Sequence, residues 1–223
     1  MKRILVTGAA GQIGTELVQA LRSHAGDAAV LATDLRDPPS VHPIRAGGPF
    51  QTLDCTDGAA VSRTVKAHGA DTVFHLAALL SAVGESRPAA TWDVNMNGLQ
   101  AVLEVAREEG TAVFVPSSIA AFGPTTPRDP TPQDTLQRPT TMYGVTKVAG
   151  ELLCDYYHTR WGVDTRGLRY PGLVSHSAPP GGGTTDWAVD IFHKALDEGR
   201  YTSFLEADTQ LDMMYMPDAV RAA

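Results

Sequence analysis

The segment VTGAAGQIG at residues 6–14 constrains the fold more than any other part of the sequence. A β-rich run, RILVT (3–7), precedes it, and a run with apolar residues at helical spacing (11–24) follows it. Gly8 permits a tight turn, Gly11 lets the backbone approach a pyrophosphate, and Gly14 lets the helix pack close to the strand. The helix N-terminus then offers free N–H groups to phosphate oxygens. The segment therefore predicts a strand–turn–helix unit that binds a dinucleotide.

The remainder of the chain continues the alternation of strands and helices. Further strands are expected at 29–34, 50–54, 71–78, 111–118 and 163–170. Further helices are expected at 57–68, at 87–109 with Trp92, Met96, Leu99, Leu103 and Ala106 on one side, and from about 141 to 161. Strands separated by helices form a parallel sheet with right-handed crossovers. The predicted fold class is α/β, a Rossmann-type doubly wound parallel sheet.

The sequence pattern changes after Pro171, where a loop rich in Gly and Pro precedes an amphipathic helix at 187–199. We therefore expect a dinucleotide-binding domain over residues 1–171. Residues 172–223 are expected to form part of a smaller substrate lobe, laid over the carboxyl ends of the strands. The chain reaches MPDAVRAA in what reads as a further helix, so this lobe is expected to be incomplete.

Two acidic residues follow predicted strands at positions suited to the adenosine half of a dinucleotide. Asp34 lies twenty residues after Gly14, where a carboxylate accepts hydrogen bonds from the ribose and repels a 2′-phosphate. This favours NAD over NADP, although Arg36 stands nearby and an arginine can accommodate that phosphate. Asp54 ends the third strand and is a candidate for the adenine edge, with a turn-forming role as the alternative.

Tyr143 and Lys147, in TMYGVTKVAG (141–150), are four residues apart and so share one face of the expected helix. For an isolated Y-x-x-x-K, the ordinary explanation is a packed phenol and a lysine that extends to water. A catalytic phenol needs help, because free tyrosine has a pKa of about 10. A neighbouring ammonium favours the phenolate, so the pair also suits acid–base chemistry.

Taken together, four stretches resemble the extended short-chain dehydrogenase/reductase family. They are the glycine turn, HLAA at 75–78, PSSIAAFG at 116–123 and YGVTK at 143–147, in the family's order. The resemblance implies that Tyr143 is the catalytic acid/base, that Lys147 assists it and holds the nicotinamide ribose, and that Ser118 polarises the substrate oxygen. Ser117 is a candidate substrate contact, and both serines could instead cap the turn after their strand. His75 is interpreted as structural.

The resemblance also implies which residues bind NAD. They are the glycine turn, the two strand-end acids, part of HLAA, the Tyr–Lys pair and a tyrosine that ends the sixth strand. The expected positions are Gly8, Gly11, Gln12, Ile13, Gly14, Asp34, Asp54, Leu76, Ala77, Ala78, Tyr143, Lys147 and Tyr170.

Two branches of the family compete for the activity. One acts on nucleotide sugars, and the other comprises epimerase-like L-threonine 3-dehydrogenases, which PSSIAAFGP, LRYPGLVS and GGGTTDWAVDIFHKAL resemble. Thr184 and Thr185, ahead of a helix, are candidate seats for the threonine carboxylate, with a simple helix cap as the alternative. Ser81 matches a substrate-contacting position of that branch. Oxidation of L-threonine at C3 is therefore the leading hypothesis. A nucleotide-sugar epimerase or dehydratase is the alternative, and a non-catalytic NAD-binding regulator is a third possibility.

Composition narrows the range of partners. The net charge of −7, with scattered basic residues, argues against nucleic acid or anionic membranes as the main partner. No apolar run approaches the ~20 residues of a membrane span, and Cys55 and Cys154 stand outside any metal-binding pattern. A cytoplasmic protein without a bound metal is expected. Two apolar stripes on the Tyr143 helix, Val148–Leu152–Tyr156 and Val145–Ala149–Leu153, predict a homodimer built with the 87–109 helix.

Overall fold

A six-stranded parallel sheet forms the centre of the protein in the computed structural model, which describes residues 1–175, 177, 183 and 185–223. The strand order is β3-β2-β1-β4-β5-β6, so the chain reverses its direction of growth beside β1. This confirms the predicted doubly wound sheet and places a crevice at the carboxyl ends of β1 and β4. The strands are β1 (Ile4–Thr7), β2 (Val30–Asp34), β3 (Phe50–Thr52), β4 (Thr72–His75), β5 (Ala112–Ser118) and β6 (Thr165–Tyr170).

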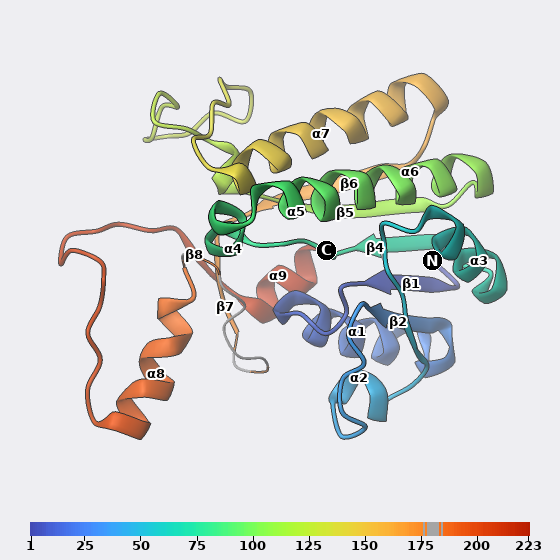
Figure 1. Ribbon diagram of the computed structural model, residues 1–223, viewed down its shortest axis with the longest axis horizontal. Coiled ribbons are helices and arrows are strands. Elements are labelled where there is room, and N and C mark those ends of the chain that lie inside the picture. The colour runs from blue at the N-terminus through green and yellow to red at the C-terminus, as the bar shows by residue number, and fades with distance from the viewer. Residues whose placement is uncertain (176, 178–182, 184) are drawn as a thin grey trace.

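Helices cover both faces of this sheet (Figure 1). One face carries α1 (Gln12–Ala25), α2 (Pro43–Ala46) and α9 (Met216–Ala222). The other carries α3 (Gly58–His68), α6 (Gly98–Glu109) and α7 (Met142–Trp161). Two faces buried in this way require strands that are apolar throughout, which explains the run ILV in β1.

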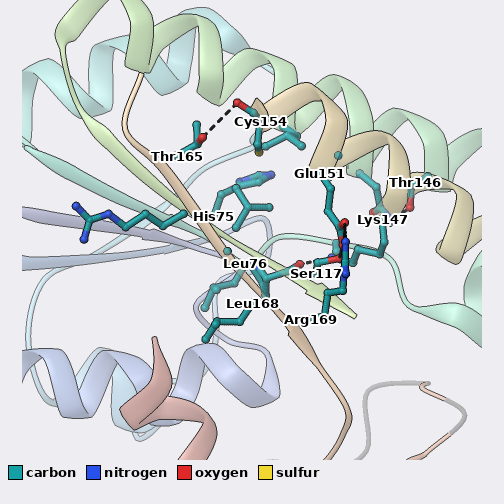
Figure 2. Close-up of a pocket in the computed structure, with 18 of the residues that line it drawn as sticks. His75, Leu76, Ser117, Thr146, Lys147, Glu151, Cys154, Thr165, Leu168 and Arg169 are labelled. Carbon is teal, nitrogen blue, oxygen red and sulfur yellow. Dashed lines mark hydrogen bonds and ion pairs between the residues drawn. The ribbon is translucent and has the colours of Figure 1, made fainter. Parts of the chain in front are cut away.

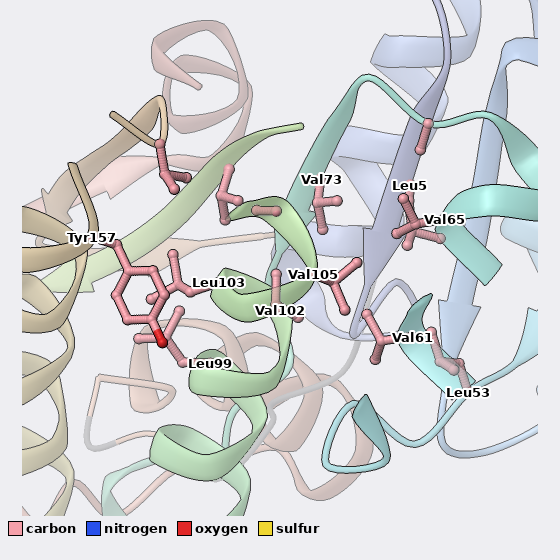
Figure 3. Packing of buried hydrophobic residues seen from close by; sticks show 14 of the residues in the cluster. Leu5, Leu53, Val61, Val65, Val73, Leu99, Val102, Leu103, Val105 and Tyr157 are labelled. Carbon is pink, nitrogen blue, oxygen red and sulfur yellow. The ribbon is translucent and has the colours of Figure 1, made fainter. Parts of the chain in front are cut away.

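Side chains of β1 alternate between two hydrophobic cores. Ile4 and Val6 pack with α1 and α9, whereas Leu5 faces α3 and α6. Figure 3 shows the second core, in which Leu5 and Val73 of the sheet meet Val61 and Val102 of the helices. The two cores pack the sheet between its helical layers and so support the strand ends that form the site.

The long helix expected at 87–109 is divided by a wider turn. It consists of α5 (Pro88–Trp92), a π-helical turn (Asp93–Asn97) and α6. A π-helical turn holds an extra residue, so residues before it are rotated relative to those after it. Met96 and Leu99 are buried as predicted, but the prediction for Trp92 was wrong, because that side chain is 44% exposed.

Two strand ends also differ from the prediction. β4 ends at His75 rather than residue 78, because its partner β1 ends at Thr7, which is paired with His75. β3 ends at Thr52, so Asp54 lies in a turn. The segment 76–80 therefore leaves the sheet as a loop and enters α4 (Ser81–Ser86).

Residues after Pro171 form a second, two-stranded parallel sheet of β7 (Gly172–Val174) and β8 (Met213–Tyr215), together with α8 (Trp187–Glu198). Figure 1 shows α8 standing away from the central sheet. The last helix, α9, returns to it: Met216 and Ala219 are fully buried against the α1 side. The division at residue 171 stays a prediction, and α9 packs on the first domain rather than extending the lobe.

α7 begins at Met142 after Thr141, whose hydroxyl accepts a hydrogen bond from the Gly144 N–H at 3.0 Å. Its outward face carries Val145, Leu152 and Tyr156, which are 40%, 62% and 53% exposed. Leu153, which was predicted to share a stripe with Val145, packs instead against the core. The assignment of residues to the two predicted stripes was therefore wrong. One exposed apolar stripe is present. Within the described ranges, no helix combines the length and apolar character that crossing a membrane requires.

Candidate functional site

A cleft of about 740 Å³ opens at the carboxyl ends of the central strands. Every residue predicted to bind the dinucleotide lines it, from the glycine turn at one end to Tyr143, Lys147 and Tyr170 at the other. Ser81, Ser117, Ser118 and Thr185 line the same cleft, whereas Thr184 lies outside the described residues. The structure thus brings the two predicted halves of the site into one cavity.

The glycine turn has the backbone geometry that its sequence predicts. Gly8 has φ +65°, and a Cβ there would lie 2.6 Å from the backbone nitrogen of Ala77, in the loop after β4. At Gly14 a Cβ would lie 2.6 Å from the Gly8 carbonyl oxygen, so the first turn of α1 packs directly on the turn. Gly11 is the N-cap of α1 and lines the cleft. The exposed N–H groups of this helix end therefore face the cavity.

The residues present fit a dinucleotide cofactor. The side-chain Nε2 of Gln12 is buried and has no hydrogen-bond partner among the described residues, at the point where α1 meets the cleft. An orphaned buried donor beside free helix N–H groups suits a pyrophosphate. The absence of side chains at Gly8 and Gly11 leaves room for its close approach.

The carboxylate of Asp34 is nearly buried at the end of β2. It accepts hydrogen bonds from Ala10 N at 3.0 Å and Arg36 N at 3.2 Å, so it links the glycine turn to the loop after β2. The Arg36 side chain is 83% exposed, and its Nε lies 3.9 Å from Asp34. Asp54 accepts bonds from the amide and hydroxyl of Thr56, at 2.9 and 2.7 Å. The turn-forming role of Asp54 is therefore observed, and its contact with adenine stays a prediction.

Tyr143 and Lys147 occupy successive turns of α7, with the Lys147 ammonium 5.3 Å from the centre of the Tyr143 ring. Lys147 Nζ donates to the Pro116 carbonyl at 2.7 Å, which joins α7 to β5. Ser118 ends β5, and its Oγ accepts from Ala120 N at 3.1 Å. The cap role is thus present, and it leaves the hydroxyl proton of Ser118 available for a substrate oxygen.

Ser117 is engaged differently from its neighbour. Its hydroxyl donates to Glu151 on α7, and Glu151 also accepts from Arg169 of β6 at 2.7 to 3.1 Å and from Gln137 at 3.1 Å. Figure 2 shows Ser117, Glu151 and Arg169 close together beside Lys147. Burial opposes ionisation of Glu151, but the bonds from Arg169, Ser117 and Gln137 outweigh it and hold the pKa of the carboxyl below its ordinary value. Ser117 can therefore offer a ligand only lone pairs, because its proton is committed.

At the other end of the cleft, Thr185 packs beside β7. A Cβ at Gly172 would lie 2.8 Å from Thr185 Cγ2, which explains the glycine at that position. Asp186 is the N-cap of α8, and its Oδ2 accepts from Gly183 N at 2.8 Å. Ser81 begins α4 rather than lying in a loop. The Tyr170 hydroxyl donates to the Ala219 carbonyl at 2.7 Å, so another part of Tyr170 meets the cleft.

Asn95, which holds a residue of the cleft wall, Leu79, was missed by the sequence reasoning. Its amide is buried in the π-helical turn and brackets Leu79 of the loop after β4, with bonds of 2.8 and 3.1 Å to the backbone N–H and carbonyl. It also donates to the Thr146 hydroxyl on α7 at 3.0 Å. A polar residue on the inner side of an expected apolar helix is the signal that could have found it.

His75 ends β4 and is 3% exposed. Its Nδ1 lies 2.8 Å from the Thr7 hydroxyl, which fits the structural role expected for it. Burial, aided by the positive charge of Lys147, lowers the pKa of the imidazole to about 4. The ring is therefore neutral at neutral pH. Among the described residues, no group of three or more His, Cys, Asp or Glu is arranged to hold a metal ion.

Comparison with known families agrees with this site. A family model described as the NAD dependent epimerase/dehydratase family matches residues 4–223. The chain belongs to this family, and NAD is its cofactor. An uncharacterized epimerase/dehydratase of Staphylococcus saprophyticus is 57% identical over 222 residues, which are 100% of this chain and 69% of that protein.

Three solved structures are also similar. L-threonine dehydrogenase from Clostridium difficile has a TM-score of 0.95 and 55% identity, covering 100% of this chain and 69% of that one. A monomeric L-threonine 3-dehydrogenase from a metagenome has a TM-score of 0.93 and 47% identity, covering 98% and 70%. UDP-glucose 4-epimerase from Thermotoga maritima has a TM-score of 0.88 and 27% identity, covering 99% and 71%. These similarities identify an NAD-dependent oxidoreductase.

Proposed function

We propose that this chain oxidises the C3 hydroxyl of L-threonine to 2-amino-3-oxobutyrate. The observation that carries the proposal is the shared cleft. It joins a dinucleotide cradle to Ser118, Tyr143 and Lys147 and continues to Thr185. The 55% identity to an L-threonine dehydrogenase supports the choice of substrate, against 27% to a UDP-glucose 4-epimerase.

In the proposed mechanism, the Tyr143 phenolate removes the proton of the C3 hydroxyl. Lys147, held against Pro116, supplies positive charge beside the phenol and a donor toward the nicotinamide ribose. Ser118 donates its free proton to the substrate oxygen and keeps that oxygen in place while the carbonyl forms. NAD, when bound, accepts the hydride that leaves C3. His75 takes no part, because it is buried and neutral behind the site.

Thr185 and the N-terminus of α8 are proposed to seat the substrate carboxylate. Thr185 and Asp186 line the cleft just before the first turn of α8. The amides of Ala188 and Val189 bond to the carbonyls of these two residues, so α8 contributes the positive potential of its first turn rather than free N–H groups. An amino-acid substrate needs a group in the same cleft that binds its carboxylate. Ser81, which lines the same cleft, is proposed as a further substrate contact.

A homodimer is proposed from the exposed stripe of Val145, Leu152 and Tyr156 on α7. Contiguous apolar side chains on one helix face favour an association that covers them. A relative that is 47% identical is named as monomeric, so the oligomeric state of this chain has to be measured directly.

The assay that tests the function follows NADH absorbance with NAD and L-threonine. We expect NADH formation with L-threonine and, in a separate assay of the sugar product, no conversion of UDP-galactose. The family description and the name of the Staphylococcus relative favour a second candidate, a nucleotide-sugar epimerase or dehydratase. Conversion of UDP-galactose without threonine oxidation would establish that alternative. Binding of NAD without either reaction would indicate a regulator, which the intact set of Ser118, Tyr143 and Lys147 argues against.

A further inference from the structure

We propose that Glu151 is a positioning residue that fixes the reactive helix α7 against the end of β5. The inference rests on the proposed function. The groups assigned to the chemistry come from two elements, because Ser118 ends β5 whereas Tyr143 and Lys147 lie on α7. Their relative placement therefore depends on what connects these elements.

Two consecutive residues of β5 are tied to α7. Pro116 accepts the hydrogen bond of Lys147 at 2.7 Å, and Ser117 donates its own to Glu151. Lys147 and Glu151 are four residues apart and so lie on one face of the helix, in line with Tyr143. The bond to Ser117 immediately precedes Ser118, and so controls the strand end that presents the Ser118 hydroxyl.

Glu151 is itself held from two further directions. Arg169 of the edge strand β6 contacts both carboxylate oxygens, and the Arg169 and Glu151 side chains are 20% and 21% exposed. Gln137 reaches Glu151 from the loop that leads into α7, and Arg169 Nη1 donates to Gln133 O of the same loop at 3.0 Å. Four segments therefore meet at one carboxylate, and Figure 2 shows three of them through Ser117, Glu151 and Arg169. A freely moving side chain could not fix a helix, but this one is immobilised on every side described.

The pattern of contacts differs from that of a purely structural ion pair in one respect. Glu104 on α6 also accepts from a hydroxyl, Tyr157 of α7, and from an arginine, Arg107. That cluster joins two helices about four turns of α7 away from Tyr143, and none of its members lines the cleft. Ser117, the partner of Glu151, does line it. Glu104 is therefore a matched control for a carboxylate that only stabilises.

The test measures kcat and KM for L-threonine, and the NAD dissociation constant, in Glu151→Leu, Ser117→Ala, their double variant and Glu104→Leu. A misplacement of about 1 Å can lower a rate on the order of 100-fold, so Glu151→Leu should lower kcat roughly ten- to hundred-fold with little change in KM. The double variant should be no slower than Glu151→Leu, because both changes break one bond. Glu104→Leu, which removes the acceptor for Tyr157 in the same way, should keep the wild-type kcat. Glu151→Gln, which retains an acceptor for Ser117, should recover part of the rate.

A second readout does not depend on turnover. In Glu151→Leu, the backbone amides of residues 118–120 and 143–147 should exchange with deuterium faster than in wild type, and in Glu104→Leu they should not. If Glu151→Leu fails to fold, Ser117→Ala breaks the same bond from the strand side and should give both signatures. Unchanged kcat and exchange in the folded variants, or additive losses in the double variant, would overturn the inference. If wild type does not oxidise threonine, the proposed function fails, and the exchange measurement still decides the role of Glu151.

Discussion

Lys147 Nζ lies 2.7 Å from the carbonyl oxygen of Pro116, so the helix that carries Tyr143 is hydrogen-bonded to the strand that ends at Ser118. The ammonium also lies 5.3 Å from the centre of the Tyr143 ring. One side chain thus connects the two elements of the site and supplies the positive charge that a phenolate needs.

Tyr143→Phe should abolish turnover and leave NAD binding nearly intact. The ring still packs on α7, and only the group that carries the proton is lost. Stopped-flow NADH formation and NAD titration by fluorescence measure the two effects. Substantial residual activity at neutral pH would remove Tyr143 from its proposed role.

Asp34→Ala should weaken NAD binding by about 1.5–3 kcal/mol, the usual range for hydrogen bonds to a charged group, and relax discrimination against NADP. Some loss of stability should accompany it, because Asp34 also accepts from Ala10 N and Arg36 N. Dissociation constants for both cofactors measure the preference. If wild type already prefers NADP, the exposed Arg36 becomes the relevant residue and the interpretation of Asp34 is wrong.

Thr185→Val keeps the shape of the side chain and removes one hydroxyl. The expected loss is about 1.5–3 kcal/mol, seen mainly in the KM for threonine if the carboxylate is held equally in ground and transition states. NAD affinity should barely change. Threonine amide, which lacks the carboxylate charge, should be a poor substrate of the wild type and lose less from the substitution. Untouched threonine kinetics would leave Thr185 with only a structural role.

Leu152→Arg should convert a dimer into a monomer, because the substitution places a charge within the exposed stripe of α7. Light scattering at micromolar concentration measures the mass. Leu196→Arg is the matched control: Leu196 is 86% exposed on α8, outside this stripe, and its substitution should leave the dimer intact. A stable, active monomer in the wild type, the state named for the metagenome relative, would contradict the prediction.

Stability should fall as the pH decreases through the titration of His75. The folded-state pKa is about 4, below the ordinary 6.5, because burial disfavours the charged ring. Between these values the unfolded chain binds the proton and the folded protein does not. The free energy of unfolding therefore decreases as the pH decreases. At pH 5 the cost is about 2 kcal/mol.

Urea unfolding at pH 7.5 and pH 5 measures this effect. His75→Gln removes the titrating ring, so this variant should lose about 2 kcal/mol less than wild type over the same interval. His193→Gln, at an exposed position on α8, should behave as wild type does. Equal losses in wild type and His75→Gln would show that His75 does not titrate as described.

Local sequence was sufficient to predict the parts of the molecule that follow from steric limits on the backbone or from the spacing of apolar residues. The glycines of residues 8–14 predict the turn that they form, because a side chain at Gly8 or Gly14 would overlap neighbouring backbone. The alternation of strands and helices predicts a parallel sheet. The predicted dinucleotide positions then line one cleft, because parallel strands present their carboxyl ends at one edge.

Only the tertiary structure decided which hydrogen bonds the individual polar side chains make. Ser117 and Ser118 are adjacent in sequence and identical in type, yet one donates to Glu151 and the other accepts from Ala120 N. The partner of Ser117 is thirty-four residues away along the chain, and it is fixed in turn by Arg169 of another strand. Periodicity cannot contain such information, because a hydrogen bond depends on positions in space.

The same reason explains Trp92 and α9. A π-helical turn, which places the amide of Asn95 on Leu79, rotates Trp92 out of the face that helical spacing assigned to it. The apolar residues of α9 could have continued the outer lobe, but Met216 and Ala219 fill the space beside α1. The sequence alone determined the elements, their order and the chemistry available at the strand ends. Packing in three dimensions determined which of several possible partners each side chain took, because burial and hydrogen bonding depend on neighbours that are distant along the chain.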